Sequence, residues 1–395
     1  MQPLEKRKIL LCLGAGASQA PLIQAGKRMG YRTLGIDRNA AGPGIPYLDE
    51  FVHLSTYESE QVVAALRPFR EQYSFAGLVA RTSGPALRTA AAIAETFDLA
   101  GLTHEIVPLA TEKSTLRKFC LKNKLPVANG TRVKDYRECE RDLTLPVIVK
   151  PDLPLVGKKE VRVIFDPSQI EEAIAKARQA SGNGYVEIET FIDGFDIGCL
   201  FWANQGQAEI LALWDERVAV RTDGAINGLG VVVPSVVSKT PVAEQIEHVA
   251  RRFAAHFPQV NALLILAFRV DMAGHPYVIE LHADLGGDLI ADELFPAADS
   301  RYDYFQCCIQ VATGAARHLT RPGFSPTAII YDHATLRQRL RPHPFVIRRE
   351  QTPQALHEAL QHLYDGTLFS GGAPTNHLAF AREYRGHLQE WVCCR

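Results

Sequence analysis

The sequence predicts an α/β protein built from more than one domain, and three observations lead to that prediction. At 395 residues, the chain is longer than the roughly 250–300 residues at which single cores stop growing. Residues 7–102 alternate short apolar runs with segments of helical periodicity, whereas the residues that follow contain closely spaced runs typical of a mixed sheet. With 47% hydrophobic and 22% charged residues, the composition is that of a globular protein with several cores.

The N-terminal segment alternates expected strands with expected helices. The strands are Ile9–Leu13, Thr33–Ile36 and Gly77–Ala80, and the helices are Ala20–Met29, Ser59–Glu71 and Pro85–Phe97. Strands that alternate with helices of about ten residues favour a parallel, doubly wound sheet. We therefore expect the chain to begin with a domain of this type.

The middle of the chain has a different pattern. A helix is expected from Leu109 to Leu125, where Pro126 would stop it. The expected strands that follow are Pro146–Pro151, Val161–Phe165, Tyr185–Ile188, Ile197–Trp202, Ile210–Leu213, Leu263–Val270 and Pro276–Leu281. Helices are expected near residues 168–180 and 242–257. Strands this close together predict a mixed sheet rather than a continuation of the first domain.

Charge and cysteine content exclude several classes of function. A net charge of −1 gives no overall field that would recruit nucleic acid or an anionic membrane. No apolar run approaches the ~20 residues that a membrane-spanning helix needs. The eight cysteines show no C-x-x-C spacing, and we expect them to be reduced core thiols of a cytoplasmic protein.

The basic residues Lys6–Lys8 ahead of the apolar run Ile9–Ala17 leave a secretory signal peptide as an alternative reading of the N-terminus. A helical segment and a second apolar strand, ending at Asp37, follow this run directly. A cleaved leader has no need of such a continuation, so we expect a strand–turn–helix–strand unit instead.

Gly14 and Gly16 lie in the turn between the first expected strand and the first helix. Backbone N–H groups and a helix N-terminus can hold an anion at such a turn, and Asp37 ends the second strand as in nucleotide-binding units. The dinucleotide-binding fingerprint has a third glycine at the position where this chain has Gln19. A nicotinamide-dependent reductase and a purely structural tight turn both remain open from these residues.

Four stretches occur in the order found in one known family. They are Glu112–Ser114 before a helix, the strand Pro146–Pro151, the segment Ile188–Asp196, and the strand with following glycines Val278–Gly287. In that order they resemble the opening step, the phosphate-binding lysine strand, the adenine–ribose linker and the metal-binding strand of the ATP-grasp family. The N-terminal segment is similar to the Rossmann-like domain that precedes ATP-grasp in carbamoyl-phosphate synthetase and the purine-pathway carboxylases. The resemblance covers roughly residues 7–320.

The resemblance implies an architecture in three parts. A Rossmann-like domain of residues 1–110 would be followed by a two-lobed ATP-grasp domain of residues 111–320, with residues 126–188 as its lid lobe. Residues 321–395 would form a small C-terminal lobe, since the stretch Arg321–Pro326 is the best linker candidate.

The resemblance also implies an ATP site. Lys113 and Lys150 would hold the phosphates, because phosphoryl transfer needs cations around the β- and γ-phosphates. Lys150 follows the apolar run Val147–Val149, which would aim its ammonium instead of leaving it in solvent. The residues implied to bind the adenine and ribose are Glu189, Phe191, Ile192 and Asp196.

In the family a mobile, glycine-rich loop follows the lysine strand, and here it corresponds to residues 152–160. This loop keeps one glycine, Gly157, and adds Lys158 and Lys159. We expect Lys158 to contribute to catalysis, since side-chain charge would replace part of the backbone cradle. A solvated surface turn is the open alternative.

The metal-binding strand departs from the family pattern. Mg²⁺ prefers carboxylates together with ATP phosphates, and Glu280 is the first expected ligand. Thirteen residues earlier, where the family has its other acid, this chain has Ala267. His282 replaces the family's asparagine and Asp284 its arginine. Because residues 280, 282 and 284 share one face of a strand, Glu280 and Asp284 form a candidate replacement pair.

The strand before it offers a second replacement. Arg269 and Asp271 share a face with Ala267, so Asp271 is a further candidate metal ligand and Arg269 a candidate catalytic cation that steadies the acyl phosphate. His282 is retained as a candidate metal ligand, although imidazole suits softer metals than Mg²⁺.

Together these implications predict an ATP-dependent ligase. It would convert a carboxylate into an acyl phosphate and couple it to an amine or ammonia, with release of ADP and phosphate. We expect small-molecule carboxylate and amine substrates, ATP and Mg²⁺ as cofactors, no nucleic-acid or membrane partner, and a chain that acts alone or as a homodimer. Arg217 and Arg221 lie where the family often binds carboxylates, with surface charge as the alternative. A catalytically silent ATP-binding protein is the rival prediction, because the metal-binding strand is altered.

Overall fold

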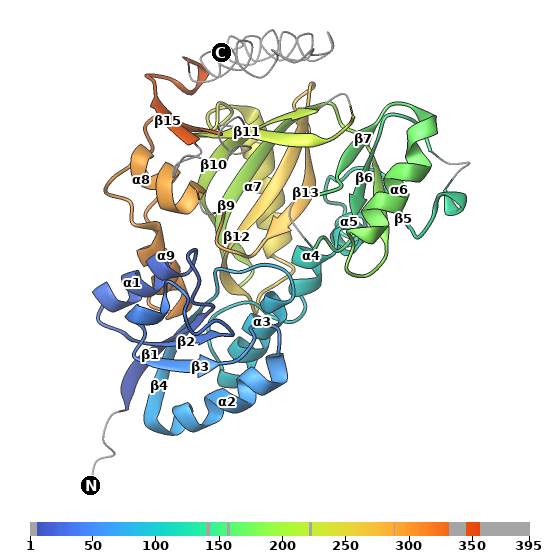
Figure 1. Ribbon diagram of the computed structural model, residues 1–395. Coiled ribbons are helices and arrows are strands. Elements are labelled where there is room, and N and C mark those ends of the chain that lie inside the picture. Colours follow the sequence, from blue (N-terminus) through green and yellow to red (C-terminus); the bar gives the residue numbers. More distant parts are fainter. Residues whose placement is uncertain are drawn as a thin grey trace.

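A computed structural model describes residues 6–139, 143–155, 159–220, 223–287, 289–331 and 345–355. Three sheets organise these residues: two have four strands each and one has seven. Figure 1 shows the N-terminal sheet in blue, the seven-stranded sheet at the centre and the second four-stranded sheet beside it in green. Parallel and antiparallel sheets with covering helices agree with the predicted α/β class. In the described ranges, no helix has the length and apolar character that crossing a membrane requires.

The N-terminal sheet is parallel, with strand order β3-β2-β1-β4. Its elements are β1 (Arg7–Leu13), α1 (Ala20–Arg28), β2 (Arg32–Asp37), η1 (Ile45–Tyr47), β3 (Glu50–His53), α2 (Ser59–Gln72), β4 (Tyr73–Val79) and α3 (Ala86–Phe97). Helices cover both faces: Leu10 packs in the cluster that includes α1 residues, and Leu11 in the cluster that includes α2 and α3 residues. The predicted doubly wound sheet is therefore what the chain forms.

Two helices follow the first sheet, where the sequence predicts a single one. They are α4 (Val107–Thr111) and α5 (Lys113–Lys122). The chain breaks at Glu112, whose backbone is extended with φ −119° and ψ 112°. The prediction of one continuous helix was wrong here, and the break makes Lys113 the first residue of a new helix.

The second four-stranded sheet, here called the lid sheet, is antiparallel with order β5-β8-β6-β7. Its elements are β5 (Gly130–Val133), η2 (Tyr136–Glu138), β6 (Val147–Pro151), β7 (Arg162–Ile164), η3 (Pro167–Gln169), α6 (Ile170–Gln179) and β8 (Val186–Thr190). Val147 and Val149 pack with Ile174 of α6. Because successive side chains alternate between faces, Lys150 lies on the face of the sheet away from α6.

The seven-stranded sheet is antiparallel, with order β13-β12-β9-β10-β11-β14-β15. Its strands are β9 (Gly194–Asn204), β10 (Gln207–Val220), β11 (Ile226–Val233), β12 (Asn261–Asp271), β13 (Pro276–His282), β14 (Thr327–Tyr331) and β15 (Phe345–Arg349). Two of these, β14 and β15, come from the segment expected to form a separate C-terminal lobe. Strand β14 pairs with β11, and β15 pairs with β14 at the edge of the sheet; the domain boundaries remain predictions.

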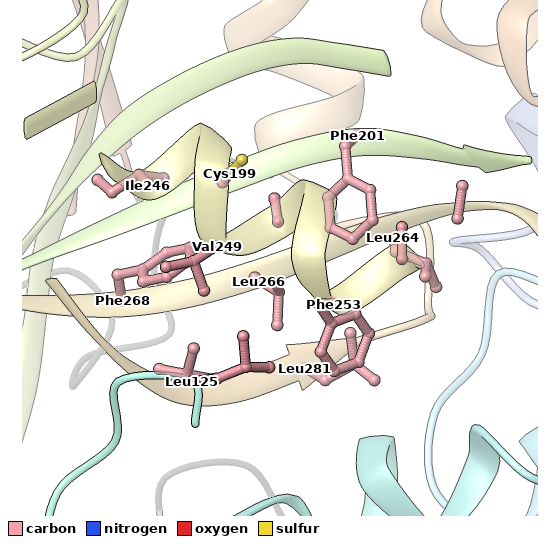
Figure 2. Close-up of a cluster of buried hydrophobic side chains, with 14 of the residues drawn as sticks. Leu125, Cys199, Phe201, Ile246, Val249, Phe253, Leu264, Leu266, Phe268 and Leu281 are labelled. Atoms are coloured by element: carbon pink, nitrogen blue, oxygen red, sulfur yellow. The ribbon is translucent and has the colours of Figure 1, made fainter. Parts of the chain in front are cut away.

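One face of this sheet packs against α7 (Pro241–Ala254). Figure 2 shows Phe253 of α7 beside Leu264 and Leu266 of β12 in this apolar layer. Since side chains alternate along a strand, the even-numbered positions of β12 face α7. The odd positions, Ala267 and Arg269 among them, therefore lie on the opposite face.

That opposite face is apolar at one end, where it is covered by η4 (Ile290–Leu294, a π-helix), α8 (Phe295–Ala298) and α9 (Tyr304–Ala312). Trp214 of β10 is fully buried there, and its ring centroid lies 6.1 Å from that of Phe295. Towards the turn between β12 and β13, charged residues replace the apolar ones. The candidate site lies at this charged end.

Six of the eight cysteines fall in the described residues, and all six are buried and free. Burial raises the pKa of the Cys12 and Cys120 thiols to about 12. The prediction of core thiols is confirmed for these six, while Cys393 and Cys394 lie outside the described residues.

Candidate functional site

Lys150 and Glu189 form an ion pair within the lid sheet. Lys150 Nζ donates to Glu189 Oε2 at 2.6 Å, and each side chain is only 7% exposed. The two strands place these residues on the same face, since Glu189 pairs in register with Ile148, two residues before Lys150. A buried ammonium needs a charged partner, and Glu189 is that partner for Lys150. The ion pair keeps the Lys150 ammonium in a fixed position, which the apolar run before it predicts.

Lys113 and Glu280 form a second ion pair, between α5 and β13. Lys113 Nζ donates to Glu280 Oε1 at 2.6 Å. On the other side of the carboxylate, His282 Nε2 lies 3.6 Å from Glu280 Oε2. Glu280 therefore stands between one of the predicted phosphate-binding cations and the imidazole that replaces the family's asparagine.

Arg269 holds the predicted nucleotide linker. Its Nη1 donates to Asp196 Oδ1 at 2.9 Å and its Nε donates to the Ile192 carbonyl at 2.8 Å. The guanidinium also lies over the Phe191 ring, 5.1 Å from the centroid. Arg269 and Asp196 are neighbours in register across β12 and β9. Three of the predicted adenine- and ribose-binding residues are thus gathered around one cation.

The predicted metal ligands do not form one cluster. Ala267 pairs in register with Glu280, so no carboxylate faces Glu280 from β12. Asp284 lies beyond β13, and its Oδ1 accepts the N–H of Gly286 at 3.2 Å. That bond belongs to a turn in which Leu285 and Gly286 have φ values of 63° and 84°. Within the part of the chain that the structure describes, no three His, Cys, Asp or Glu side chains are grouped so as to hold a metal ion.

Asp271 is bonded within the turn between β12 and β13. Its carboxylate accepts the N–H groups of Ala273 at 2.9 Å and His275 at 2.8 Å. The Tyr277 hydroxyl donates to it at 3.4 Å. Burial would raise the pKa of Asp271, but the bonds from His275 and Ala273 outweigh burial and lower it. These bonds give Asp271 a role in the turn, four residues along β12 from Ala267.

Glu187 is a buried acid that the sequence analysis did not single out. It is 0% exposed and pairs in register with Lys150 across β8 and β6. Arg117 of α5 donates its Nε–H to the Glu187 carboxylate. Burial raises the pKa of Glu187 to about 7 despite this bond. The alternation of Glu187 and Glu189 along β8 was the signal that could have identified it.

The segment predicted to be a mobile loop begins with a buried residue. Asp152 is 0% exposed, so the first residue of the expected loop 152–160 is part of the packed interior, while the mobility of the loop stays a prediction. Its carboxylate accepts hydrogen bonds from three other segments. Lys158, the predicted catalytic lysine, lies outside the described residues, and Lys159 is exposed.

The glycine turn after β1 is braced by the chain itself. Ala15 N–H donates to Asp37 Oδ2 at 2.7 Å, and Gly16 N–H donates to Gln19 Oε1 at 3.0 Å. Asp37 and Gln19 thus occupy two amides of the turn that could otherwise hold an anion. This bonding favours the structural interpretation of the turn over the reductase alternative.

The two acidic residues near the end of β10 point to different faces. Asp215 is buried and accepts the N–H of Val236 at 3.0 Å and the Ser235 hydroxyl. Glu216 pairs in register with Asp196 and accepts the Trp214 Nε1–H at 3.4 Å. Glu216 therefore belongs to the charged face, whereas Asp215 stabilises the turn after β11. Arg221 lies outside the described residues.

No protein-family model and no curated protein sequence matches this chain. Among solved structures, the L-amino acid ligase from Bacillus licheniformis has a TM-score of 0.72 and 19% identity, over 92% of this chain and 98% of that chain. An N5-carboxyaminoimidazole ribonucleotide synthetase in its ADP complex has a TM-score of 0.71 and 15% identity, with 92% and 98% covered. A biotin carboxylase from Campylobacter jejuni in complex with a nucleotide has a TM-score of 0.68 and 14% identity, with 95% and 99% covered. At these identities the likeness shows the fold alone, and it confirms the predicted fold class.

Proposed function

We propose that this protein, whose fold is that of the ATP-grasp ligases, uses ATP to turn a carboxylate into an acyl phosphate and couples it to an amine or ammonia. One observation carries the proposal. Lys113, Lys150 and Arg269, from three different elements, are each held against a carboxylate on the charged faces of the lid sheet and the seven-stranded sheet. The two lysine ammonium groups, each largely shielded from solvent, are suited to bind a polyphosphate, and Arg269 lies beside the expected nucleoside site.

The two lysines would bind phosphate by exchange of one anion for another. At Lys150, phosphate oxygens would replace the Glu189 carboxylate, and at Lys113 they would replace the Glu280 carboxylate. The ammonium groups of both lysines are already largely removed from solvent. A charge-assisted hydrogen bond contributes about 1.5–3 kcal/mol. Phe191, Ile192 and Asp196 would hold the nucleoside, with Asp196 accepting ribose hydroxyl groups as acids do in dinucleotide folds.

The Glu280 carboxylate would share a divalent cation with the nucleotide. Glu280 offers carboxylate oxygens, and Mg²⁺ is commonly bound through one or two carboxylates together with substrate phosphates. When bound, the cation would neutralise charge on the β- and γ-phosphates. Glu280 would hold it, and Lys113 would be released to a phosphate oxygen.

The reaction that these residues would support has two steps. A carboxylate oxygen attacks the γ-phosphorus, the bond between this phosphorus and the β–γ bridging oxygen breaks, and ADP leaves. The amine nitrogen then attacks the acyl carbon, the bond from that carbon to the phosphate oxygen breaks, and the nitrogen loses a proton. The lysines would stabilise the charge that moves between oxygens, and we propose that Arg269 acts mainly by ordering the linker residues to which it is bonded.

Amino acids are the first substrates to test, because one structural neighbour is an L-amino acid ligase. The purified chain would be incubated with ATP, Mg²⁺ and pairs of amino acids, and ADP would be measured together with coupled product by mass spectrometry. ADP formation that requires both substrates would support the ligase. ATP binding without turnover for any carboxylate tried would favour the silent ATP-binding protein.

The nucleotide site is tested separately by removing the pair in the lid sheet. The variant Lys150→Met/Glu189→Gln removes both charges together, so no unpaired charge is left buried. We expect it to fold and to bind ADP about tenfold or more weakly in calorimetry, in line with the loss of a charged contact. Lys176→Met is the matched control, since Lys176 is exposed on α6 of the same lobe. ADP affinities of the double variant and wild type within about twofold (less than 0.5 kcal/mol) would refute the site.

A further inference from the structure

Asp152, the residue directly after β6, accepts side-chain hydrogen bonds from three different segments of the chain. Its Oδ1 accepts the Ser114 N–H at 2.8 Å, and its Oδ2 accepts Arg132 Nε–H at 2.8 Å and Asn183 Nδ2–H at 2.9 Å. Burial would raise the pKa of Asp152, but these bonds outweigh burial and lower it. The side chain is therefore a buried carboxylate whose charge is satisfied by three donors.

The backbone of Asp152 adds two more bonds. Its carbonyl accepts the Lys113 N–H at 3.0 Å, and its own N–H donates to the Tyr185 carbonyl at 3.1 Å. Lys113 and Ser114 are the first two residues of α5, and the N-cap of that helix, Glu112, makes no side-chain capping bond. Asp152 thus caps α5 from a distant part of the sequence, where its charge also complements the positive end of the helix dipole.

These bonds join two parts of the molecule. Arg132 and Asn183 belong to the lid lobe. Helix α5 belongs instead to the body of the molecule, because its residues Leu116 and Cys120 pack in one cluster with Leu281 of β13. Figure 1 shows α5 between β13 and the strands of the lid sheet. Asp152 lies at the junction between the lid lobe and the body.

We propose that Asp152 is the positioning residue that fixes Lys113 and Lys150 relative to each other, an inference that rests on the proposed function. Lys150 lies two residues before it on β6, and Lys113 begins the helix that it caps. One residue therefore connects the lysine of the lid lobe with the lysine of the body. Two cations act on one polyphosphate only when their separation is fixed, and displacements of about 1 Å are costly in such sites.

The first test variant is Asp152→Asn, which keeps the size of the side chain. Its amide nitrogen would face the donors of Arg132 and Asn183, so the junction would lose both charge and complementarity. The compensating variant, Asp152→Asn/Asn183→Asp, exchanges the two side chains. The new carboxylate at position 183 can accept from the new amide, and it returns a negative charge to the junction where Arg132 now bonds Asp152. It also keeps the acceptor that Ser181 Oγ and the Tyr185 N–H use now.

The readout is the ratio of the dissociation constants of adenosine and ADP, measured by calorimetry. Because both lysines serve the phosphates, Asp152→Asn should weaken ADP binding about tenfold or more and adenosine binding by less than about threefold, since tenfold corresponds to one lost contact of 1.4 kcal/mol. The compensating variant should recover most of the ADP affinity. A role in stability alone would weaken both ligands together.

Ile174→Val is the matched control. Ile174 is buried in the lid-lobe core away from α5, and the change should cost about 0.5–1.5 kcal/mol of stability without altering the affinity ratio. If Asp152→Asn does not fold, the ratio in the compensating variant decides, and a value near that of wild type supports the inference. An unchanged ratio in Asp152→Asn, or a ratio that the exchange does not restore, would overturn it. Failure of wild type to bind ADP would refute the proposed function instead.

Discussion

Ala267 and Glu280 face each other in register across β12 and β13. The methyl group of Ala267 gives this position no second carboxylate, and the side chains of Lys113 and His282 lie beside Glu280. Of the two replacement acids considered, Asp271 is bonded to its own turn and Asp284 to Gly286. Under the proposed function, we therefore propose Glu280 as the principal protein ligand for a divalent cation.

This arrangement predicts an order of effects among the three acids. Glu280→Gln should have the largest effect: the gain in ADP affinity on adding Mg²⁺ should fall by about tenfold. The reason is that this change removes a carboxylate that has no substitute on the facing strand. Asp284→Asn keeps an oxygen for Gly286 and should have a smaller effect. Asp271→Asn should lower the melting temperature without changing the Mg²⁺ dependence. Calorimetric titration of ADP at several Mg²⁺ concentrations measures the Mg²⁺ dependence of all three variants, and thermal unfolding measures the melting temperature of Asp271→Asn. A larger effect on the Mg²⁺ dependence by Asp271→Asn than by Glu280→Gln would contradict the assignment.

The buried acid Glu187 predicts a dependence of stability on pH. Its pKa is raised from 4.5 to about 7 in the folded chain, so between these values the folded state binds more protons than the unfolded state. Stability then falls as the pH rises through this window. At about 1.4 kcal/mol for each pH unit, the loss is on the order of 3 kcal/mol. Above about pH 7 the loss is complete.

The variant Glu187→Gln isolates this contribution, since glutamine keeps an acceptor for Arg117 and does not titrate. Denaturation at pH 5 and at pH 8 should show that wild type loses stability relative to the variant as the pH rises. Ile174→Val, in the same lobe, should differ from wild type by the same amount at both pH values, because neither side chain ionises. An increase in the relative stability of wild type with pH would show that the pKa is lowered instead.

The layer between α7 and the seven-stranded sheet predicts a large cavity effect. Phe253 is 0% exposed, and its ring centroid lies 5.5 Å from that of Phe119 and 5.3 Å from that of Phe257. Phe253→Ala should destabilise the protein by about 3–5 kcal/mol, through lost burial and the cavity that remains. Leu121→Ala, at a position that is 48% exposed, should stay within about 0.5 kcal/mol. Thermal unfolding of both variants checks this, and similar melting temperatures would show that the core had been misplaced.

The sequence by itself determined the local elements and their faces. Alternation of helices and strands predicted the parallel sheet, and the apolar run Val147–Val149 predicted that Lys150 would be held on one face of a strand. These properties depend on periodicity and on neighbours a few residues away. The prediction of one helix over residues 109–125 was wrong because it used the same local information. The helix breaks at Glu112, where the Lys113 N–H donates to the Asp152 carbonyl, and local periodicity cannot predict a bond to so distant a residue.

Only the tertiary structure decided which charges meet. Lys113 bonds to Glu280, which is 167 residues away in the sequence, and Ser114 bonds to Asp152, which is 38 residues away. Such pairs depend on sheet register and on how the lobes pack, and a shift of one residue in register would turn each strand partner to the other face. The burial of Asp152 follows from the same cause: its three donors lie on elements that come together only when the lid lobe packs against α5.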